Sequence, residues 1–306
     1  MAGRAGWLAP APDLLPRHGV EGDRGAVRNG ALNRTRRGAL LSAVVALVLT
    51  LGACAAPPAT PQSEGAPALP PAGAVPDYQL GGAYDPAPEV GIVGRDRGAD
   101  PAPGVYSICY VNGFQTQPAE LGSWPDDLLL RHDGEVVFDP DWPDEALLDT
   151  ASAERRERIA DTVTAWIEDC AESGFDAVEF DNLDSYSRSD GALSLEDNLA
   201  LATLYVEAAH AAGLAAGQKN AAEDASTLHE RAGFDFAVTE ECAVYRECGV
   251  YTAVYGEHVI DIEYTDELPR PFIEMCADGD APSSMVLRDR DLVTPADDGY
   301  AFATCP

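Results

Sequence analysis

The sequence contains little positive charge. Lysine and arginine together number 20 against 52 aspartate and glutamate residues, and Lys219 is the only lysine among the 306 residues. The formal net charge is -32, and from Cys54 onward 13 basic residues face 49 acidic ones. Binding to nucleic-acid phosphates requires basic side chains, so this composition argues against a nucleic-acid partner.

Motifs of several enzyme classes are also missing. No G-x-G-x-x-G and no P-loop motif follows a predicted strand, and no G-x-S-x-G is present. The sequence therefore gives no support to a dinucleotide-binding protein, a P-loop NTPase or a serine hydrolase of the nucleophile-elbow type. No cofactor is expected. The hydrophobic fraction of 46% and the charged fraction of 24% are those of a globular protein, which excludes disorder of the whole chain.

The amino-terminal part is typical of an export signal. An uncharged run at residues 38–50 follows three nearby arginines and leads to the sequence Leu-Gly-Ala-Cys, which ends at Cys54. The run is short for a membrane span, and the Leu-Gly-Ala-Cys sequence resembles the bacterial lipobox. We therefore predict that residues 1–53 are a signal peptide and that Cys54 is lipidated, which places the protein on the cell surface with a membrane anchor.

Three alternatives remain for this segment. Ordinary cleavage nearby leaves Cys54 unmodified or removes it, which gives a secreted protein, and Thr35-Arg36-Arg37 also admits a twin-arginine route. The stretch before the apolar run is long for a signal peptide, so translation starting downstream of Met1 is a further alternative.

Residues 54–77 are rich in proline and alanine and contain almost no large apolar residues. Such a stretch cannot bury a core and is expected to be a semi-extended, disordered tether. The folded part is then predicted as residues 78–306, which is the size of one barrel domain, and we expect a monomer.

Six cysteines remain after Cys54, an even number in an exported chain, so up to three disulfides are expected. Cys242 and Cys248 are close enough in sequence to bridge one loop, but the pairing is otherwise open among 15 possibilities. A zinc site is the rival interpretation. It is disfavoured because no C-x-x-C pair and no histidine spacing of metal-ligand type occur.

Strand and helix patterns alternate along the folded part. Strands are predicted at residues 105–111, 175–180, 214–217, 234–239 and 259–264, and helices at 154–172, 196–212 and 224–232. Strands separated by helices indicate βα units and a parallel sheet, so the predicted fold class is α/β, a (β/α)₈ TIM-like barrel.

Each predicted strand ends in a segment that carries polar residues. They are Tyr110 to Asn112, Glu179 to Asp184, Gln218 to Asn220, Glu240 with Glu241, and Asp261 to Tyr264. In a parallel barrel the carboxyl ends of the strands share one face, where active sites lie. Because side chains alternate along a strand, Glu179 and Asp181 are expected to point the same way, opposite to Val178 and Phe180.

Each of these residues also has a non-catalytic interpretation. Glu179 and Asp181 could cap a helix or, together with Asp184, bind a cation such as Ca²⁺. Lys219 could be an ordinary surface lysine, and Glu240 and Glu241 ordinary loop acids of an acidic protein. The tyrosines 110, 186 and 264 serve equally as packing at a rim or as platforms for a sugar.

The same segments resemble a known family. The stretch 174–184 with Asn198, then Gly217 to Ala221 and Val238 to Cys242, together with 109–112 and 114–117, are similar to glycoside hydrolase family 114 over about residues 79–265. The resemblance implies a TIM-like barrel with endo-α-1,4-polygalactosaminidase activity. It places one catalytic acid at Asp181 and the other at Glu240 or Glu241, with Glu179 as a substitute.

This resemblance agrees with the chemistry of glycoside hydrolysis, which needs one protonated acid and one carboxylate acting as nucleophile or base. We assign the base or nucleophile to Asp181 and the acid to Glu240, with the stereochemical outcome open. The predicted substrate-binding residues are Tyr110, Asn112, Asn182, Asp184, Tyr186, Gln218, Lys219, Asn220, Glu263 and Tyr264.

The implied galactosamine polymer is cationic when its amines are free, and an acidic protein attracts it. Asp184 and Glu263 are the expected ammonium partners. Solubility and salt tolerance explain the same negative charge without reference to a ligand. The alternative function is a lipid-anchored, non-catalytic polysaccharide-binding protein, which would tolerate loss of either catalytic carboxylate.

Overall fold

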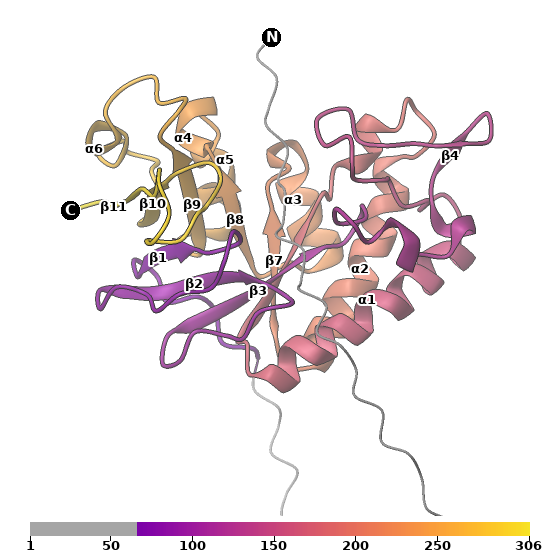
Figure 1. The fold of residues 1–306 in the computed structure, drawn as a ribbon, viewed down its shortest axis with the longest axis horizontal. Coiled ribbons are helices and arrows are strands. Elements are labelled where there is room, and N and C mark those ends of the chain that lie inside the picture. Colours follow the sequence, from indigo (N-terminus) through magenta and orange to yellow (C-terminus); the bar gives the residue numbers. More distant parts are fainter. Residues whose placement is uncertain (1–65) are drawn as a thin grey trace, which may run out of the picture. The chain divides into compact units, whose positions relative to one another are not determined.

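The computed structural model of the protein describes residues 66–306, in which a nine-stranded sheet nearly closes into a barrel (Figure 1). Eight strands run parallel to their neighbours, and the ninth, β11, is antiparallel to β10. In sheet order they are β1 (Val75–Tyr78), β2 (Val90–Asp96), β3 (Tyr106–Asn112), β6 (Ala177–Asp181), β7 (Ala215–Lys219), β8 (Phe236–Glu240), β9 (Val259–Tyr264), β10 (Ser284–Arg288) and β11 (Phe302–Thr304). The predicted α/β barrel is confirmed.

Two long helices cover one side of the sheet. They are α1 (Ala153–Ser173), which precedes β6, and α2 (Leu195–Ala211), which precedes β7, and they pack against each other (Figure 1). The Ser152 side chain caps the start of α1, and Ser194 with Asp197 forms a capping box at the start of α2. Gly174 ends α1 with a φ of 95°, a backbone conformation that favours glycine.

The remaining elements are short. They are β4 (Arg131–His132) and β5 (Glu135–Val136), α3 (Ala225–Thr227), α4 (Cys242–Tyr245), α5 (Cys248–Tyr255) and α6 (Phe272–Met275), with 3₁₀ turns at Leu121–Ser123, Asp126–Leu128, Ser185–Arg188 and Ala222–Asp224 and a π turn at Leu228–Ala232. The helix predicted at 224–232 is thus a composite of 3₁₀, α and π turns.

The barrel departs from regular (β/α)₈ alternation in its first part. Within residues 66–306, no helix joins β1 to β2 or β2 to β3. A long connection of mostly irregular structure, residues 113–152, then follows β3. Its last part is anchored by Ala146, Leu147 and Leu148, which are fully buried. This connection therefore has a fixed position beside the carboxyl end of β3.

The folded part begins before the predicted boundary at residue 78. Strand β1 starts at Val75 and pairs with β2, and the Ala68 and Pro70 carbonyls accept hydrogen bonds from Tyr106 and His258. The predicted tether, residues 54–77, is therefore corrected at its carboxyl end, because backbone pairing compensates there for the lack of large apolar residues. The predicted signal peptide, residues 1–53, and the lipidation site Cys54 lie outside the described residues.

Alternating side chains divide the core into two layers. The barrel interior holds Ile92, Ile108, Val238, Ile262 and their neighbours, whereas Val178 and Phe180 belong to the larger cluster between sheet and helices. Burial of such side chains contributes about 1.5–3 kcal/mol each. The predicted orientation of β6, with Val178 and Phe180 opposite to Glu179, is confirmed.

A buried arginine joins the two strands at the gap in the barrel. Strands β10 and β1 lie in contact without a backbone ladder between them. The Arg288 side chain, fully buried, donates to Asp77 Oδ1 at 2.7 Å and to the carbonyl of Tyr78. Its guanidinium thus supplies hydrogen bonds that a strand ladder provides elsewhere in the sheet.

Three disulfides link the six cysteines: Cys109 with Cys170, Cys242 with Cys248, and Cys276 with Cys305. The first ties β3 to α1, and the second closes the loop between α4 and α5 that the sequence predicts. Because disulfides persist in oxidising compartments, they indicate an exported protein. Among residues 66–306, no helix has the length and apolar character needed to cross a membrane.

Candidate active site

Three neighbouring strands end in residues that meet inside the barrel. Asp181 ends β6, Lys219 ends β7 and Glu240 ends β8. The Lys219 Nζ atom lies 3.6 Å from Asp181 Oδ2 and 3.0 Å from Glu240 Oε2. The structure thus places two acids, 59 positions apart in the sequence, on either side of the only lysine.

The shared lysine limits the separation of the two acids. Asp181 Oδ2 and Glu240 Oε2 can be no farther apart than their two distances to Nζ, 3.6 and 3.0 Å, taken together. Carboxyl groups are about 5–5.5 Å apart in retaining glycosidases and about 6.5–9.5 Å apart in inverting ones. The limit applies to one oxygen of each carboxyl, and it places both acids within reach of one glycosidic linkage.

Solvent reaches the acids but not the lysine. The side chains of Asp181 and Glu240 are 18% and 28% exposed, whereas that of Lys219 is 2% exposed. A bound molecule can therefore contact both carboxylates while the ammonium lies behind them.

Asp181 is held in place by a tyrosine as well as by the lysine. The Tyr110 hydroxyl donates to Asp181 Oδ2 at 2.8 Å, and the Asn182 backbone N–H donates to Oδ1 at 2.7 Å. Burial and the nearby charge of Asp181 raise the pKa of Tyr110 well above its usual value, so this hydroxyl remains a donor. A carboxylate with these donors is fixed in orientation and ready to attack an electrophile.

Glu240 is surrounded by donors. Asn220 donates to Oε2 at 3.0 Å and accepts the Glu240 backbone N–H at 2.8 Å, and Tyr264 donates to Oε1. Burial opposes ionisation of this carboxyl, but the charge of Lys219 and the hydrogen bonds from Tyr264 and Asn220 outweigh it and lower the pKa of Glu240 to about 2. In the unliganded site Glu240 is therefore ionised.

Lys219 is charged although it is buried. Burial lowers the pKa of its amine, but the charges of Asp181, Glu240 and Glu179 outweigh this effect and hold the pKa above its usual value. The Nζ atom also lies 5.4 Å from the ring centre of Tyr78 and 5.6 Å from that of Tyr110. These aromatic faces add to the stabilisation of the cation.

Glu179 lies two residues before Asp181 on the same face of β6, deeper in the barrel. Its carboxyl is fully buried, accepts a hydrogen bond from the Tyr78 hydroxyl at 2.5 Å, and is otherwise unpartnered at Oε2 within the part of the chain that the structure describes. Burial raises the pKa of Glu179 to about 7, against the opposing effects of Lys219 and Tyr78. A fully buried carboxyl cannot contact a substrate, so its predicted role as a substitute catalyst is corrected to support of Lys219 from below.

One residue of the site was not found by sequence reasoning. Glu145, in the long connection after β3, accepts a hydrogen bond at Oε2 from the Asn112 side chain at 2.9 Å. Burial and the nearby charge of Asp181 raise the pKa of Glu145 to about 8. It brings a further acid to the centre formed by Asp181, Lys219 and Glu240.

The sequence profile of glycoside hydrolase family 114 matches residues 57–306. The chain belongs to this glycoside hydrolase family. Family and barrel fold together support a glycosidase, and the two acids at the carboxyl ends of β6 and β8 are where such an enzyme carries its chemistry.

Two solved structures share this fold. Aspergillus fumigatus Ega3, in a complex with galactosamine, is 24% identical with a TM-score of 0.61, and the match covers 74% of this chain and 95% of Ega3. The glycoside hydrolase domain of PelA from Pseudomonas aeruginosa is 13% identical with a TM-score of 0.50, covering 71% and 95%. At these identities the likeness concerns the fold alone. No curated protein sequence matches the chain.

In this family 114 chain Glu241 is not part of the acid pair. It is buried, has a φ of 60°, and receives Arg290 at 2.7 and 3.2 Å on its two carboxylate oxygens. Of the two neighbouring acids, Glu240 contacts Lys219 and Glu241 contacts Arg290.

Because Glu241 contacts Arg290 and not Lys219, its replacement should affect stability more than activity. Glu241→Gln should keep kcat within about threefold of the wild type but lower the free energy of unfolding by about 1–3 kcal/mol, because Arg290 loses one of its carboxylate partners. Steady-state kinetics and denaturant unfolding measure the two effects. A large loss of kcat at unchanged stability would return Glu241 to the catalytic centre.

Two other predicted site residues lie on the wrong face of the sheet. The Gln218 side chain, fully buried, donates to the Asn220 and Ala221 carbonyls and accepts from Tyr255 of α5. Glu263 is fully buried and accepts the Ala243 backbone N–H of α4. Both face the helices because they are one residue away in register from the inward-facing Lys219 and Tyr264. Gln218 as a hydroxyl ligand and Glu263 as an ammonium partner are therefore corrected.

The loop after β6 is a polar network. Arg188 donates to Asn182 Oδ1 and to Asp184, and Tyr186 donates to Asp224 at 2.8 Å. Asn182 in turn donates to Asn112 Oδ1 at 3.1 Å. The charge of Asp184 is already compensated by Arg188, so it is a weaker ammonium partner than the sequence suggests.

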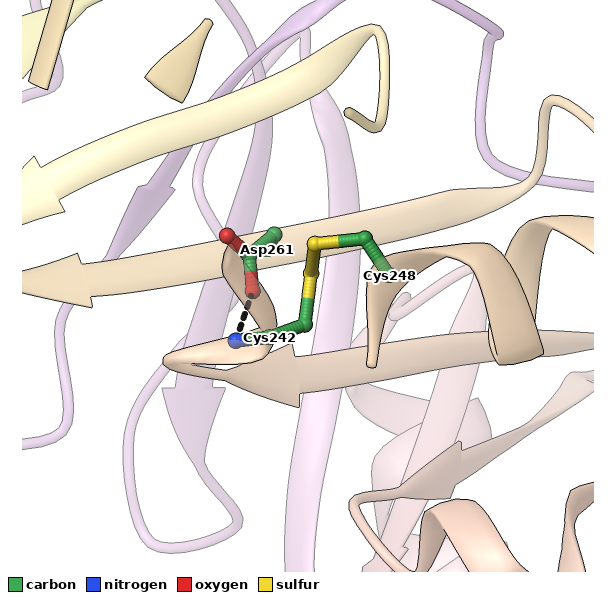
Figure 2. Close-up of side chains that lie close together, drawn as sticks. All are labelled: Cys242, Cys248 and Asp261. Atoms are coloured by element: carbon green, nitrogen blue, oxygen red, sulfur yellow. Dashed lines mark hydrogen bonds between the residues drawn. A yellow bond between two sulfur atoms is a disulfide. The ribbon is translucent and has the colours of Figure 1, made fainter. Parts of the chain in front are cut away.

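The arrangement also bears on metal binding. Among residues 66–306, one grouping of potential ligands occurs, Cys242, Cys248 and Asp261, and Figure 2 shows its two sulfurs joined to each other as a disulfide. Asp261 Oδ1 accepts the Cys242 backbone N–H at 3.1 Å. Cysteines joined in a disulfide have no free thiolate to bind a metal. Of the three acids of the Ca²⁺ interpretation, Asp181 pairs with Lys219 and Asp184 pairs with Arg188, so both already have a cationic partner.

Proposed function

We propose that this protein cleaves an α-1,4-linked galactosamine polysaccharide with retention of configuration, using Asp181 as nucleophile and Glu240 as general acid and base. The observation that carries the proposal is the pair of partly exposed carboxylates held by one buried lysine. In the first step Asp181 bonds to the anomeric carbon as the bond from that carbon to the leaving oxygen breaks, and Glu240, which must first take up a proton from solvent, gives that proton to the leaving oxygen. In the second step Glu240 takes a proton from water, which displaces Asp181.

The surrounding side chains support these roles. Tyr110 and Lys219 fix the orientation of Asp181, and Asn220 and Tyr264 fix that of Glu240. When Asp181 forms the covalent bond to the sugar, its carboxylate loses its negative charge. Lys219 then has Glu240 as its remaining charged partner among these two acids. That change favours the ionised Glu240 needed to activate water in the second step.

The substrate class rests on charge and on one relative. Ega3, which shares the fold, was solved with galactosamine bound. In this chain Glu179, Asp181 and Glu240 surround a single lysine, Glu145 is bound to the nearby Asn112, and the net charge is -32. A polymer with free amines is attracted to such a site, and a neutral one is not. A lipid anchor at Cys54 completes the proposal, since it would hold the enzyme at the membrane surface.

The proposal predicts hydrolysis that mass spectrometry can detect. The purified full chain should shorten α-1,4-galactosamine oligomers, and the product formed first should carry an α-anomeric end when followed by NMR. Cleavage should weaken with added salt, because electrostatic attraction to a cationic chain is screened.

The unfavourable outcomes are distinct. A folded protein, judged by cooperative thermal unfolding, that binds oligomers and leaves them intact would be the non-catalytic binding protein. Products with a β-anomeric end would instead overturn retention and leave the hydrolase in place.

A further inference from the structure

Glu145 is held at the catalytic centre by a side chain of the barrel. Its Oε2 accepts from Asn112 Nδ2 at 2.9 Å, and Asn112 Oδ1 accepts from Asn182, the residue that follows Asp181. No hydrogen bond to Glu145 Oε1 occurs within the described part of the chain. The carboxyl is partly exposed, so this oxygen is open to a ligand.

The position of Glu145 is fixed from its own segment as well. The residue that follows it, Ala146, is fully buried and donates its N–H to Thr116 Oγ1 at 3.1 Å. The Glu145 backbone donates to Trp142 and accepts from Asp139. A carboxylate fixed in this way needs little reordering to bind a cation, which favours recognition over chance proximity.

The chemistry of the sugar places a cation near this carboxyl. In a 2-amino sugar the amine is attached to the carbon next to the anomeric carbon, which Asp181 attacks. A sugar positioned for attack must therefore present its C2 substituent close to Asp181. A free amine is an ammonium there, whereas an N-acetyl group is neutral and larger.

We propose that Glu145 recognises the 2-ammonium group of the sugar bound beside Asp181 and makes the enzyme prefer free-amine over N-acetylated residues at that subsite. This inference rests on the galactosaminidase activity proposed above. It makes Glu145 a specificity residue, with Asn112 as the residue that positions it.

The charges around Glu145 agree with this role. Asp181, Asp139 and Asp144 all raise its pKa beyond the effect of burial, and only the Asn112 hydrogen bond lowers it. Asp139 is itself compensated by Arg188. With a pKa of about 8, Glu145 is mostly protonated at pH 7 in the free site, and an incoming ammonium should expel that proton.

Kinetics with two matched substrates test the proposal. Glu145→Gln keeps an acceptor for Asn112 but loses the charge. The KM for galactosamine oligomers should rise about tenfold with kcat within about threefold, and the values for N-acetylated oligomers should not change. Glu135→Gln removes one charge from the exposed β5 and is the control, with both substrates unaffected.

Calorimetry gives a readout that does not require turnover. In the Glu240→Gln background, binding of galactosamine oligomers at pH 7 should release close to one proton, measured in buffers of different ionisation enthalpy. The further change Glu145→Gln should abolish that release.

Proton release that persists in the double variant, or an unchanged substrate preference in Glu145→Gln, overturns the inference. Failure of the wild type to cleave either oligomer contradicts the proposed function instead, and the calorimetric comparison still decides the role of Glu145.

Discussion

Asp181→Asn should reduce kcat by about 10⁴-fold or more, and Glu240→Gln by about 10²–10⁴-fold, without loss of the fold. Each change keeps the shape of the side chain and its acceptor oxygen, so Tyr110 and Asn220 remain paired. What is lost is a nucleophile in the first case and a proton donor in the second. The larger effect is expected at Asp181, because no other partly exposed carboxylate lies against Lys219 on that side of the site.

Rescue by azide separates the two roles. In Asp181→Ala, azide can enter the space left by the nucleophile and should give a β-glycosyl azide from the α-linked substrate. In Glu240→Ala, the covalent intermediate still forms with an activated leaving group, and azide in place of water should give the α-glycosyl azide. NMR of the products distinguishes the two configurations.

Matched variants control for charge and fold. Asp190→Asn removes a carboxylate from an exposed position in the loop after β6, and Glu241→Gln removes one from the residue next to Glu240. Both should retain activity. Swapped azide products would exchange the roles of Asp181 and Glu240, and full activity in Asp181→Asn would remove the carboxylate pair from the mechanism.

The sequence predicts the central part of the barrel well. Strand β9 has the predicted bounds, and α1 and α2 differ from their predictions by one residue at each end. Apolar periodicity is strong in these segments, and polar residues mark where each strand ends. Strand β1 is not predicted from the sequence, because its residues, VPDY, continue a proline-rich stretch. It is a strand through its pairing with β2.

The errors within the site have one physical cause. Side chains alternate along a strand, so Gln218 and Lys219 in β7, or Glu263 and Tyr264 in β9, cannot both point into the barrel, whereas Glu241 follows the end of β8 with a φ of 60°. The alternation that places Glu179 and Asp181 on one face of β6 also separates the members of these two pairs. Glu145 is different, since it lies in an irregular connection and its place beside Asn112 depends on long-range packing that no local pattern records.

Lys219→Met should destabilise the protein by about 3–5 kcal/mol at neutral pH, the usual consequence of removing one partner from a buried ion pair. Asp181 and Glu240 would face each other, with Glu179 below, and among residues 66–306 no other cation pairs with them. Thermal unfolding of the two proteins across pH measures the difference.

The pH dependence of this loss has a definite sign. In the wild type the pKa of Glu240 lies at about 2, below its usual 4.5, so its ionised form stabilises the fold above about pH 4.5 and ceases to do so as pH falls through 2. Without Lys219 this contribution disappears, and the carboxyls take up protons at higher pH. The stability gap between the wild type and Lys219→Met should therefore be largest near pH 7 and narrow toward pH 3. A gap that is constant over this range would show that Lys219 acts by packing alone.

The pH dependence of activity should also reflect the charge of Lys219 next to Glu240. Glu240 must carry a proton to act as the acid, and the charge of Lys219 lowers the pKa of Glu240 to about 2, so kcat/KM of the wild type should fall as pH rises above that pKa. Removing the cation raises the pKa of a neighbouring carboxyl by about 1–3 units, so the descending limb of Lys219→Met should move to higher pH by that amount, although kcat is lower. Lys219→Arg keeps the charge and should leave the limb in place. A limb that stays fixed in Lys219→Met would mean that the group it reports is not in contact with Lys219, and Glu240 would lose its role as the acid.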